Sequence, residues 1–392
     1  MLNIDFEKCT GCSACQQICL QQSIKMITND FGFIYPQVSE NCIDCKRCET
    51  VCPINKTNKN DIESIAYAVV NKNKSSILKA SSGGAFDALA NYVIQQNGVV
   101  YGCALDSSLK AKHIRVEYAD ELDILYGSKY IQSDINNAFM KVKDDLMKNR
   151  VVLFSGTPCQ IAGLKSFLGR NFDNLILVDI ICHGVPSQAY FDKYIKWLEK
   201  KKKCIITDYN FRSKSNHGWS LAGEYTILNK KNKKLNKKLF YFDNFYYYYF
   251  LQSTIYRNSC YSCKYANSNR EADFTIGDFW GAEKFNFEFD TSNGCSLLLI
   301  NTKKAKEIVD KLELEKSIID LEYAKKYNAQ LTVPSTYSME WDVRMNDFVN
   351  LSAEKIQKKF VFENYRTIIL ARLKYLLPSK LKRIINKIRY KL

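Results

Sequence analysis

Two runs of cysteine with identical spacing lie within the first 52 residues. Each run reads C-x2-C-x2-C-x3-C, and a proline follows only the second run. The runs are formed by Cys9, Cys12, Cys15 and Cys19, and by Cys42, Cys45, Cys48 and Cys52. Three thiols so close in sequence can surround one iron–sulfur cube while the fourth ligand comes from the other run. The repeat therefore predicts two [4Fe–4S] clusters near the N-terminus.

The spacing also predicts how the ligands are divided between the two clusters, because the fourth cysteine of such a run binds the cluster of the other run. One cluster is expected at Cys9, Cys12, Cys15 and Cys52, and the other at Cys42, Cys45, Cys48 and Cys19. A zinc site needs only two CxxC pairs, so the third cysteine of each run favours iron–sulfur over structural zinc. A cluster pair carries single electrons and has no substrate pocket, so the other end of the electron path is expected in the rest of the chain or in a partner.

Composition narrows the class of protein further. Apolar residues make up 46% of the 392 residues, which is enough to bury sizeable cores and excludes global disorder. The sequence shows no basic and apolar leader at its N-terminus and no apolar run long enough to span a bilayer. In a cytoplasmic protein, 15 cysteines indicate metal binding more than disulfides. The lack of a visible leader and of a spanning run predicts a cytoplasmic location.

The hydrophobic pattern predicts an α+β fold in three parts. A small bacterial-ferredoxin-like domain is expected over 1–56, a larger mixed α/β domain over 57–350, and a basic helical tail over 351–392. Helices are predicted over 85–96 and 134–148, and strands over 99–105, 151–155 and 175–181. Strands beyond residue 205 have a more antiparallel pattern. The tract 240–250 holds nine aromatic residues and is predicted to be a strand buried on both faces, in preference to a ligand-stacking surface.

Four further cysteines lie in unusual local settings. Cys159 and Cys182 each follow a predicted strand, in SGTPCQ and CHGVP, and Cys260 and Cys263 form a CxxC pair. Four thiols suffice for a third cluster or for a zinc ion. The remaining cysteines, Cys103, Cys204 and Cys295, have no partner spacing and are expected to be ordinary buried thiols.

Several long stretches resemble the coenzyme F-420 hydrogenase/dehydrogenase beta-subunit family. They are SSGGAFDALANYVIQQNGVVYG, GSKYIQSD, VLFSGTPCQIAGLKSFLG, LVDIICHGVPS, FRSKSNHGW and CYSCKYANSNREADFTIGDFWG. The resemblance covers about residues 1–300, and it implies an FAD-binding domain with its own [4Fe–4S] cluster. In the founding members the carrier that exchanges hydride is a deazaflavin, coenzyme F-420.

The resemblance also implies site residues. The four cysteines Cys159, Cys182, Cys260 and Cys263 look like the ligands of the third cluster. The segments near the flavin correspond to Ser82, Gly83, Gly84, Ser128, Lys129, Tyr130, Gly156 and Thr157. The SSGG turn precedes a predicted helix whose N-terminus could receive a phosphate, but a plain helix cap is an equally good interpretation. Lys129 could place a positive charge beside the flavin, or it could be an ordinary surface lysine.

Two of the three histidines stand beside glycine in these stretches, and a neutral histidine near a flavin could transfer protons. They are His183 and His217, and a structural hydrogen-bonding role is at least as good an interpretation for either. Lys129 and His183 are therefore the candidate catalytic residues.

The C-terminal segment 366–392 holds nine Lys or Arg residues and no Asp or Glu. Ile369, Leu373, Leu376 and Leu377 are spaced for one face of a helix. Such a helix suits an anionic membrane surface, and docking on its own domain is an equally good interpretation. No base-reading motif accompanies the charge, so no nucleic-acid partner is expected.

Taken together, the sequence predicts an iron–sulfur flavoprotein oxidoreductase. It would pass electrons between [4Fe–4S] clusters and FAD, with hydride exchange to a deazaflavin or another small carrier. The alternative is a non-catalytic electron-transfer subunit of a larger complex. The expected partner is a redox carrier, either a deazaflavin or a ferredoxin-like protein. An anionic surface on the inner face of the membrane is one of the two interpretations of the tail. The sequence leaves the oligomeric state open.

Overall fold

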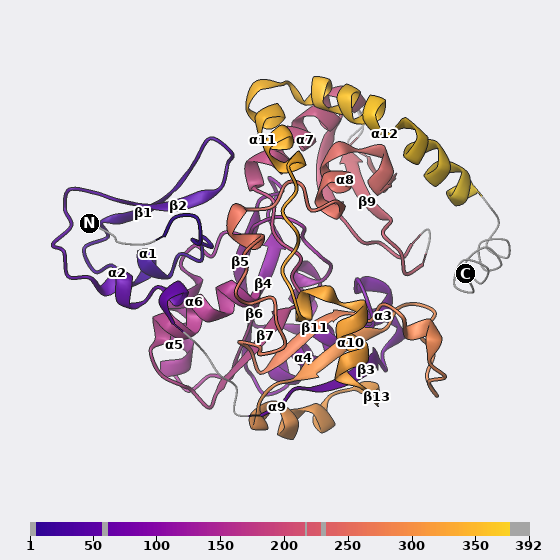
Figure 1. Cartoon of the computed structure of the whole chain (residues 1–392). Coiled ribbons are helices and arrows are strands. Elements are labelled where there is room, and N and C mark those ends of the chain that lie inside the picture. The colour runs from indigo at the N-terminus through magenta and orange to yellow at the C-terminus, as the bar shows by residue number, and fades with distance from the viewer. Residues whose placement is uncertain (1–4, 57–61, 216–217, 229–232, 377–392) are drawn as a thin grey trace.

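The computed structural model describes residues 5–56, 62–215, 218–228 and 233–376. Its central feature is a large mixed sheet with the strand order β13-β3-β12-β11-β7-β6-β4-β5 (Figure 1). The strands are β3 (Ile65–Asn71), β4 (Val99–Leu105), β5 (Ala111–Val116), β6 (Val152–Gly156), β7 (Leu175–Ile180), β11 (Phe274–Asp278), β12 (Ser296–Ile300) and β13 (Leu314–Ile319). Strands β4, β6, β7 and β11 run parallel, and the flanking strands pair antiparallel. The mixture of parallel and antiparallel strands confirms the predicted mixed α/β class.

Helices cover both faces of this sheet because its strands are apolar on both sides. Val99 and Tyr101 of β4 face α5 (Ala138–Met147) and α6 (Pro158–Leu168). Val100, between them, faces α4 (Ala85–Ile94) and α9 (Lys303–Ile308) in a separate core. This two-residue alternation agrees with the strand and helices predicted for these stretches.

The N-terminal unit packs on the outer side of α5 and α6 (Figure 1). It consists of α1 (Ala14–Ile18), the hairpin β1 (Ile24–Thr28) and β2 (Ile34–Val38), α2 (Arg47–Thr50) and the turn η1 (Pro53–Asn55). Ala14 and Val51 lie in one hydrophobic core with Phe139, Ile161 and Leu164 of the larger part. The unit therefore shares a core with the rest of the chain.

An aromatic lobe lies above the sheet in Figure 1. It contains α7 (Gln188–Lys202), β8 (Ile205–Asn210), β9 (Gly223–Leu228), β10 (Lys234–Leu239), η3 (Tyr241–Asp243), α8 (Phe245–Leu251), α11 (Glu340–Asn350) and α12 (Ala353–Leu376). Strands β8, β9 and β10 form an antiparallel sheet, as predicted for this half of the chain.

The predicted aromatic strand over 240–250 is wrong, because the tract forms the turn η3 and the helix α8. Asn244 caps α8 by accepting a hydrogen bond from the backbone N–H of Tyr247 (2.7 Å). The helix is enclosed by α7, α11 and α12, and Phe245, Tyr246 and Tyr249 are all buried. A segment that is apolar all round suits a fully enclosed helix as well as it suits a buried strand.

The remaining described elements are short. They are α3 (Lys74–Lys79), η2 (Ala119–Leu125), η4 (Asn258–Cys260), η5 (Ala282–Lys284), η6 (Val309–Lys311), α10 (Leu321–Tyr327) and η7 (Ala329–Leu331). In the parts of the chain that the structure describes, no helix has the length and apolar character needed to cross a bilayer.

Of the basic segment 366–392, the structure describes only the last part of α12. This helix departs from helical geometry at Asn364. One face packs on the aromatic lobe: Ile368 is buried, Tyr375 contacts Phe242, and Arg372 pairs with Asp243 (2.9 Å). Ile369 and Leu373, from the predicted apolar stripe, remain more than half exposed. The side chain of Leu376 and all residues from 377 onward lie outside the described residues.

Candidate functional site

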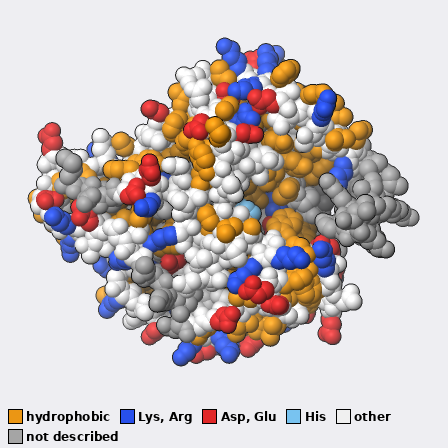
Figure 2. Space-filling view, viewed as in Figure 1, with side chains coloured by type: hydrophobic (Ala, Val, Ile, Leu, Met, Phe, Trp, Pro, Cys, Tyr) orange, Lys and Arg blue, Asp and Glu red, His pale blue; other side chains and the backbone are white. Residues whose placement is uncertain are grey.

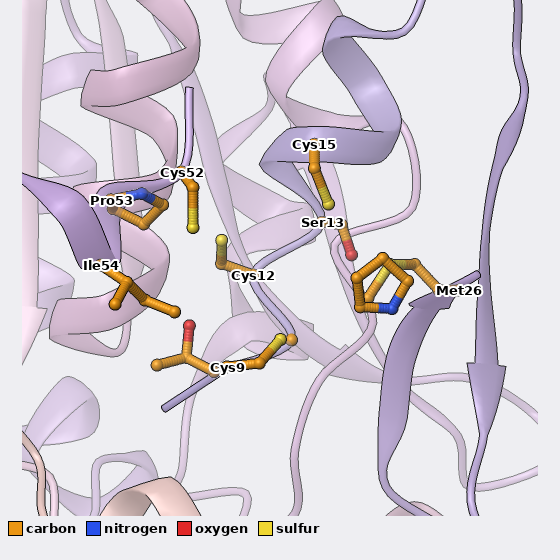
Figure 3. Close-up of a pocket in the computed structure, with 11 residues that line it drawn as sticks. Cys9, Cys12, Ser13, Cys15, Met26, Cys52, Pro53 and Ile54 are labelled. Carbon is orange, nitrogen blue, oxygen red and sulfur yellow. The ribbon is translucent and has the colours of Figure 1, made fainter. Parts of the chain in front are cut away.

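Four thiols from the two cysteine runs line one small cavity in the N-terminal unit (Figure 3). They belong to Cys9, Cys12, Cys15 and Cys52 and form the first thiol set. Apolar side chains, including Met26, Pro53 and Ile54, complete the wall. The structure thus brings together the set of cysteines that the crossed ligand pattern predicts for the first cluster.

The two cysteine loops repeat the same unusual backbone. The second and fourth residues after the first cysteine have left-handed φ angles in both loops. These residues are Gly11 (66°) and Ser13 (62°) in the first loop, and Asp44 (50°) and Lys46 (59°) in the second. Left-handed φ is uncommon outside glycine. The shared conformation shows that the sequence repeat is also a structural repeat.

The second thiol set, predicted for the other N-terminal cluster, lies nearer the surface. Cys42 and Cys45 are exposed, and Cys48 is partly buried. Burial raises the pKa of Cys48, and the nearby Cys42 adds to the shift. Cys19 ends α1, which packs against the α2 helix that carries Cys48.

Burial dominates the electrostatics of the first thiol set. It raises the pKa of Cys12 to about 12, and it also raises the pKa of Cys15. The neighbouring thiols of Cys9 and Cys52 raise both values further, because like charges oppose ionisation. Thiolates in such a site need bound positive charge, which an iron–sulfur cluster supplies. In the described ranges, no three His, Cys, Asp or Glu side chains are placed to hold a single metal ion.

A third thiol set lies at the start of α6. Cys159 is in the first turn of α6, Cys182 follows β7, and Cys260 and Cys263 lie in and after η4. Burial raises the pKa of Cys182 well above its usual range, and the other three thiols add to the shift. The four cysteines implied for the third cluster are therefore neighbours, and none is in a disulfide.

A buried ion pair anchors the loop that follows Cys263. Arg270 pairs with Asp179 of β7 (3.1 Å), and both side chains are fully buried. The same guanidinium donates to the backbone carbonyls of Tyr265 and Asn267, each at 3.1 Å. The sheet therefore holds the CxxC loop in place.

The first and third thiol sets meet α6 at points one helical turn apart. Cys159 belongs to the third set, and Gly163, four residues on, contacts Cys12 of the first. Residues four apart share one helix face and are displaced by about 6 Å along the axis. The charge of Cys159 also contributes to the raised pKa of Cys12, after burial and Cys9 and ahead of Cys52.

The third thiol set adjoins a cavity of about 450 Å³. Cys182 lines this cavity, and so do most of the residues that the sequence associates with a flavin: Ser82, Gly84, Ser128, Lys129, Tyr130, Gly156, Thr157 and His183. These residues come from the α4 N-terminus, the segment after η2, and the ends of β6 and β7. Figure 2 shows a hollow in the middle of the face, with hydrophobic side chains along its sides.

Gly83 does not belong to the cavity wall. A Cβ at this position would lie 2.3 Å from the carbonyl oxygen of Val69 and 2.5 Å from the amide of Ser296. Its own N–H donates to the hydroxyl of Ser296 (2.8 Å). Glycine is therefore required here because the chain packs closely against the paired strands β3 and β12, while Ser82 and Gly84 face the cavity.

Lys129 lies in the cavity wall, and its ammonium group donates hydrogen bonds to backbone carbonyls. The three N–H bonds can donate to the carbonyls of Ile124 (3.3 Å), Leu125 (2.9 Å) and Tyr126 (2.6 Å) at the end of η2. Burial lowers the pKa of Lys129 to about 8. Its charge can reach a ligand through space, but a direct hydrogen bond would require one of these three to break.

The third histidine, His113, also lines the cavity, and no sequence signal pointed to it. Its Nε2–H donates to the carbonyl of Ser155 (2.9 Å), so Nδ1 accepts from the hydroxyl of Ser133 (3.1 Å). Gln160 donates to the same hydroxyl (2.9 Å). Burial lowers the pKa of His113 to about 4, so it is neutral at pH 7. Cys103 lies in the same wall. The sequence predicted only an ordinary buried thiol at this position.

An ionic and aromatic wall closes another side of the cavity. The buried guanidinium of Arg212 donates to the carboxylate of Asp278 (2.9 Å), which also accepts from Trp219 Nε1 (2.9 Å). Trp219 stacks on Trp280, with ring centroids 5.4 Å apart. His183 lines the cavity with an exposed side chain, and its carbonyl accepts from Ser335. His217 lies outside the described residues.

Comparisons with known proteins match two parts of the chain. Residues 149–326 match the family described as the C terminus of the coenzyme F420 hydrogenase/dehydrogenase beta subunit. Residues 8–56 match the 4Fe-4S dicluster domain. No curated protein matches the chain.

One solved structure that resembles the chain comes from xenon derivatization of the F420-reducing [NiFe] hydrogenase complex from Methanosarcina barkeri. The two are 15% identical, with a TM-score of 0.41 over 70% of this chain and 90% of that one. The two matched regions hold all twelve cysteines of the three thiol sets. The chain therefore contains a region, 149–326, that matches the C terminus of the coenzyme F420 hydrogenase/dehydrogenase beta subunit, preceded by a 4Fe-4S dicluster domain over 8–56.

Proposed function

We propose that this protein is an iron–sulfur flavoprotein that transfers electrons between three [4Fe–4S] clusters and FAD, and exchanges hydride with a soluble carrier. The observation that carries this proposal is the position of Cys182. Its thiol belongs to the third thiol set and also lines the 450 Å³ cavity. The third set also adjoins the first set, because Gly163, four residues after Cys159, lies against Cys12. The first thiol set, the third thiol set and the cavity thus adjoin one another in this order.

The residues present suit these groups. In the N-terminal unit, the first cluster would be held by Cys9, Cys12, Cys15 and Cys52, and the second by Cys19, Cys42, Cys45 and Cys48. The third would be held by Cys159, Cys182, Cys260 and Cys263. When bound, clusters supply single-electron transfer and a flavin supplies the conversion between single and paired electrons.

The chain's own residues would position the flavin in the cavity. The N-terminus of α4, at Gly84, offers a positive dipole end for a phosphate. The neutral His113 and the Arg212–Asp278 pair present fixed dipoles that need no rearrangement. The Lys129 ammonium would favour the reduced flavin by its charge. His183, exposed in the cavity, is the candidate for proton transfer.

One anaerobic preparation tests the central proposal. Iron, sulfide, zinc and flavin would be measured on the same sample. We expect about twelve iron and twelve sulfide per chain and one flavin. Zinc in place of iron would contradict the proposal and favour a zinc-stabilised scaffold.

The carrier and the catalytic role need a second measurement. Flavin bleaching by a reduced deazaflavin or by NADH, with turnover, would identify an enzyme and its carrier. Reduction only by a ferredoxin-like protein would favour the alternative, an electron-transfer subunit of a larger complex.

A peripheral membrane contact through the tail is a further part of the proposal. Along α12, Phe362, Ile369 and Leu373 are each at least half exposed, and they point away from the face that docks on the lobe. Figure 2 shows hydrophobic side chains together with Lys and Arg over this helix. An apolar stripe with cations beside it suits the surface of an anionic bilayer.

A further inference from the structure

Arg257 is the largest fully buried side chain of the described residues, with 1% exposure. Its guanidinium joins the N-terminal unit to the larger part of the chain. Nε donates to the carbonyl of Cys9 (2.6 Å), and Nη2 donates to the carbonyl of Ile34 (2.9 Å). Nη1 donates to the side-chain oxygen of Gln132 (3.3 Å). Every one of these acceptors is neutral.

No described carboxylate forms an ion pair with Arg257, which sets it apart from the other buried arginines. Arg212 pairs with Asp278 (2.9 Å), Arg270 with Asp179 (3.1 Å) and Arg344 with Glu363 (2.8 Å). An arginine remains charged in proteins, and burying its charge without an anion is costly. The ring of Tyr35, 4.1 Å from the guanidinium, offsets only part of this cost.

The guanidinium faces cysteines of two thiol sets. It binds the carbonyl of Cys9, in the first set, and Cys260 of the third set follows three residues after it. The backbone N–H of Cys260 donates to the carbonyl of Arg257 (2.9 Å). The cation therefore lies between the two sets.

The first cysteine loop leaves room for this arrangement. A Cβ on Gly11 would lie 3.1 Å from Nη1 of Arg257 and 2.8 Å from Nε2 of Gln132. Gln132 Nε2 in turn donates to the carbonyl of Thr10 (3.0 Å). Arg257 and Gln132 thus hold one loop, but only Arg257 brings charge.

We propose that Arg257 is the internal counter-ion of the first and third clusters, and that it raises the reduction potential of both. The proposal rests on the proposed function, since it requires that the two thiol sets hold clusters. A cluster with four thiolates carries net negative charge, and reduction adds one electron to it. A buried cation nearby favours the added charge, and net charge around a cluster is one determinant of its potential.

The test is a redox titration of the anaerobically purified full chain, followed by electron paramagnetic resonance. We expect Arg257→Gln to lower the potentials of the first and third clusters. The potential of the second, at Cys19, Cys42, Cys45 and Cys48, should not move. Arg257→Lys keeps the charge and should stay closer to the wild type. Gln132→Met is the matched control: it removes the hydrogen bonds to the loop, keeps the charge and should leave the potentials near those of the wild type.

Iron content distinguishes a failure of the proposed function from a failure of the counter-ion role. Wild-type protein without iron would overturn the proposed function itself. Fully loaded Arg257→Gln protein with unchanged potentials would overturn the counter-ion role alone. If Arg257→Gln loses iron from these two sites while Arg257→Lys retains it, charge is required for assembly, which supports the proposal. Loss of iron in both variants would overturn it in favour of a purely structural role.

Discussion

The sulfur of Cys12 lies 3.0 Å from the position that a Cβ would occupy on Gly163 of α6. This glycine lets the N-terminal unit approach the helix that carries Cys159 in its first turn. The close approach of the first thiol set to α6 therefore depends on the absence of a side chain at residue 163. A displacement of either thiol set would change the distance that an electron must cross between the two proposed clusters.

We expect Gly163→Val to displace Cys12 and to lower the iron content, because a branched side chain overpacks a contact that is already tight. The cost in stability should be about 1–3 kcal/mol, as for other overpacked cores. Gly163→Ala should have a smaller effect in the same direction. Iron analysis and the unfolding midpoint of the two variants check the order, and equal iron in Gly163→Val and wild type would contradict it.

Replacing one cysteine of the third thiol set should remove one cluster and leave the other two. We expect Cys260→Ser to lose about four of about twelve irons, because serine is a poor ligand for iron in a cubane. Cys204→Ser is the matched control, since Cys204 is a partly buried thiol outside all three sets. A full iron complement in Cys260→Ser would show that these four cysteines do not form a cluster site.

Lys129 should make flavin affinity depend on pH. Burial lowers the pKa of Lys129 to about 8, so the ammonium is present at pH 7 and is largely lost at pH 9. Affinity for an anionic flavin nucleotide should fall over this range. Lys129→Met should bind flavin more weakly at pH 7, or lower the flavin potential, and it should show a weaker pH dependence. Titration calorimetry at the two pH values checks this, and identical profiles for both proteins would exclude the role.

His113 should make the stability of the fold depend on pH in the acid range. Burial lowers the pKa of His113 to about 4 in the folded chain, below its value in the unfolded chain. Between these two values the unfolded chain binds more protons, so stability rises with pH. The contribution is complete above about pH 6.5 and is lost as the pH falls through about 4. It amounts to roughly 3 kcal/mol at most. Denaturant unfolding from pH 4 to 7 should show a shallower slope for His113→Gln, and an unchanged slope would reject the assignment.

The exposed stripe of α12 should bind vesicles that contain anionic lipid. Replacing Phe362, Ile369 and Leu373 with Gln removes apolar area and keeps every charge, so we expect weaker sedimentation with such vesicles and unchanged iron content. Ile318→Gln, which alters an exposed isoleucine of β13, is the control. Deleting residues 366–392 should abolish the binding. Equal binding by the deletion and the full chain would exclude a membrane role for the tail.

Much of the local structure was predictable because it depends on neighbours in the sequence. The strand predicted over 99–105 is β4, and Pro158 occupies the first turn of α6 after the Thr157 cap. The helix predicted over 134–148 is four residues shorter at its start, because the chain before Ala138 pairs with β5 instead. The aromatic tract was predicted wrongly because local pattern does not distinguish an enclosed helix from an enclosed strand.

The sequence by itself predicted the chemistry of the N-terminal unit, from eight thiols in two runs of identical spacing and their division into two crossed sets. It predicted the third thiol set through the resemblance to a known family. Only the tertiary structure decided which of the other groups share a site. It placed His113 in the cavity wall, moved Gly83 out of it, and left Arg257 without a carboxylate between two thiol sets. Ligand spacing is a property of a few adjacent residues, whereas the burial of a charge and the wall of a cavity depend on segments far apart in the chain. No pattern within one segment can therefore reveal them.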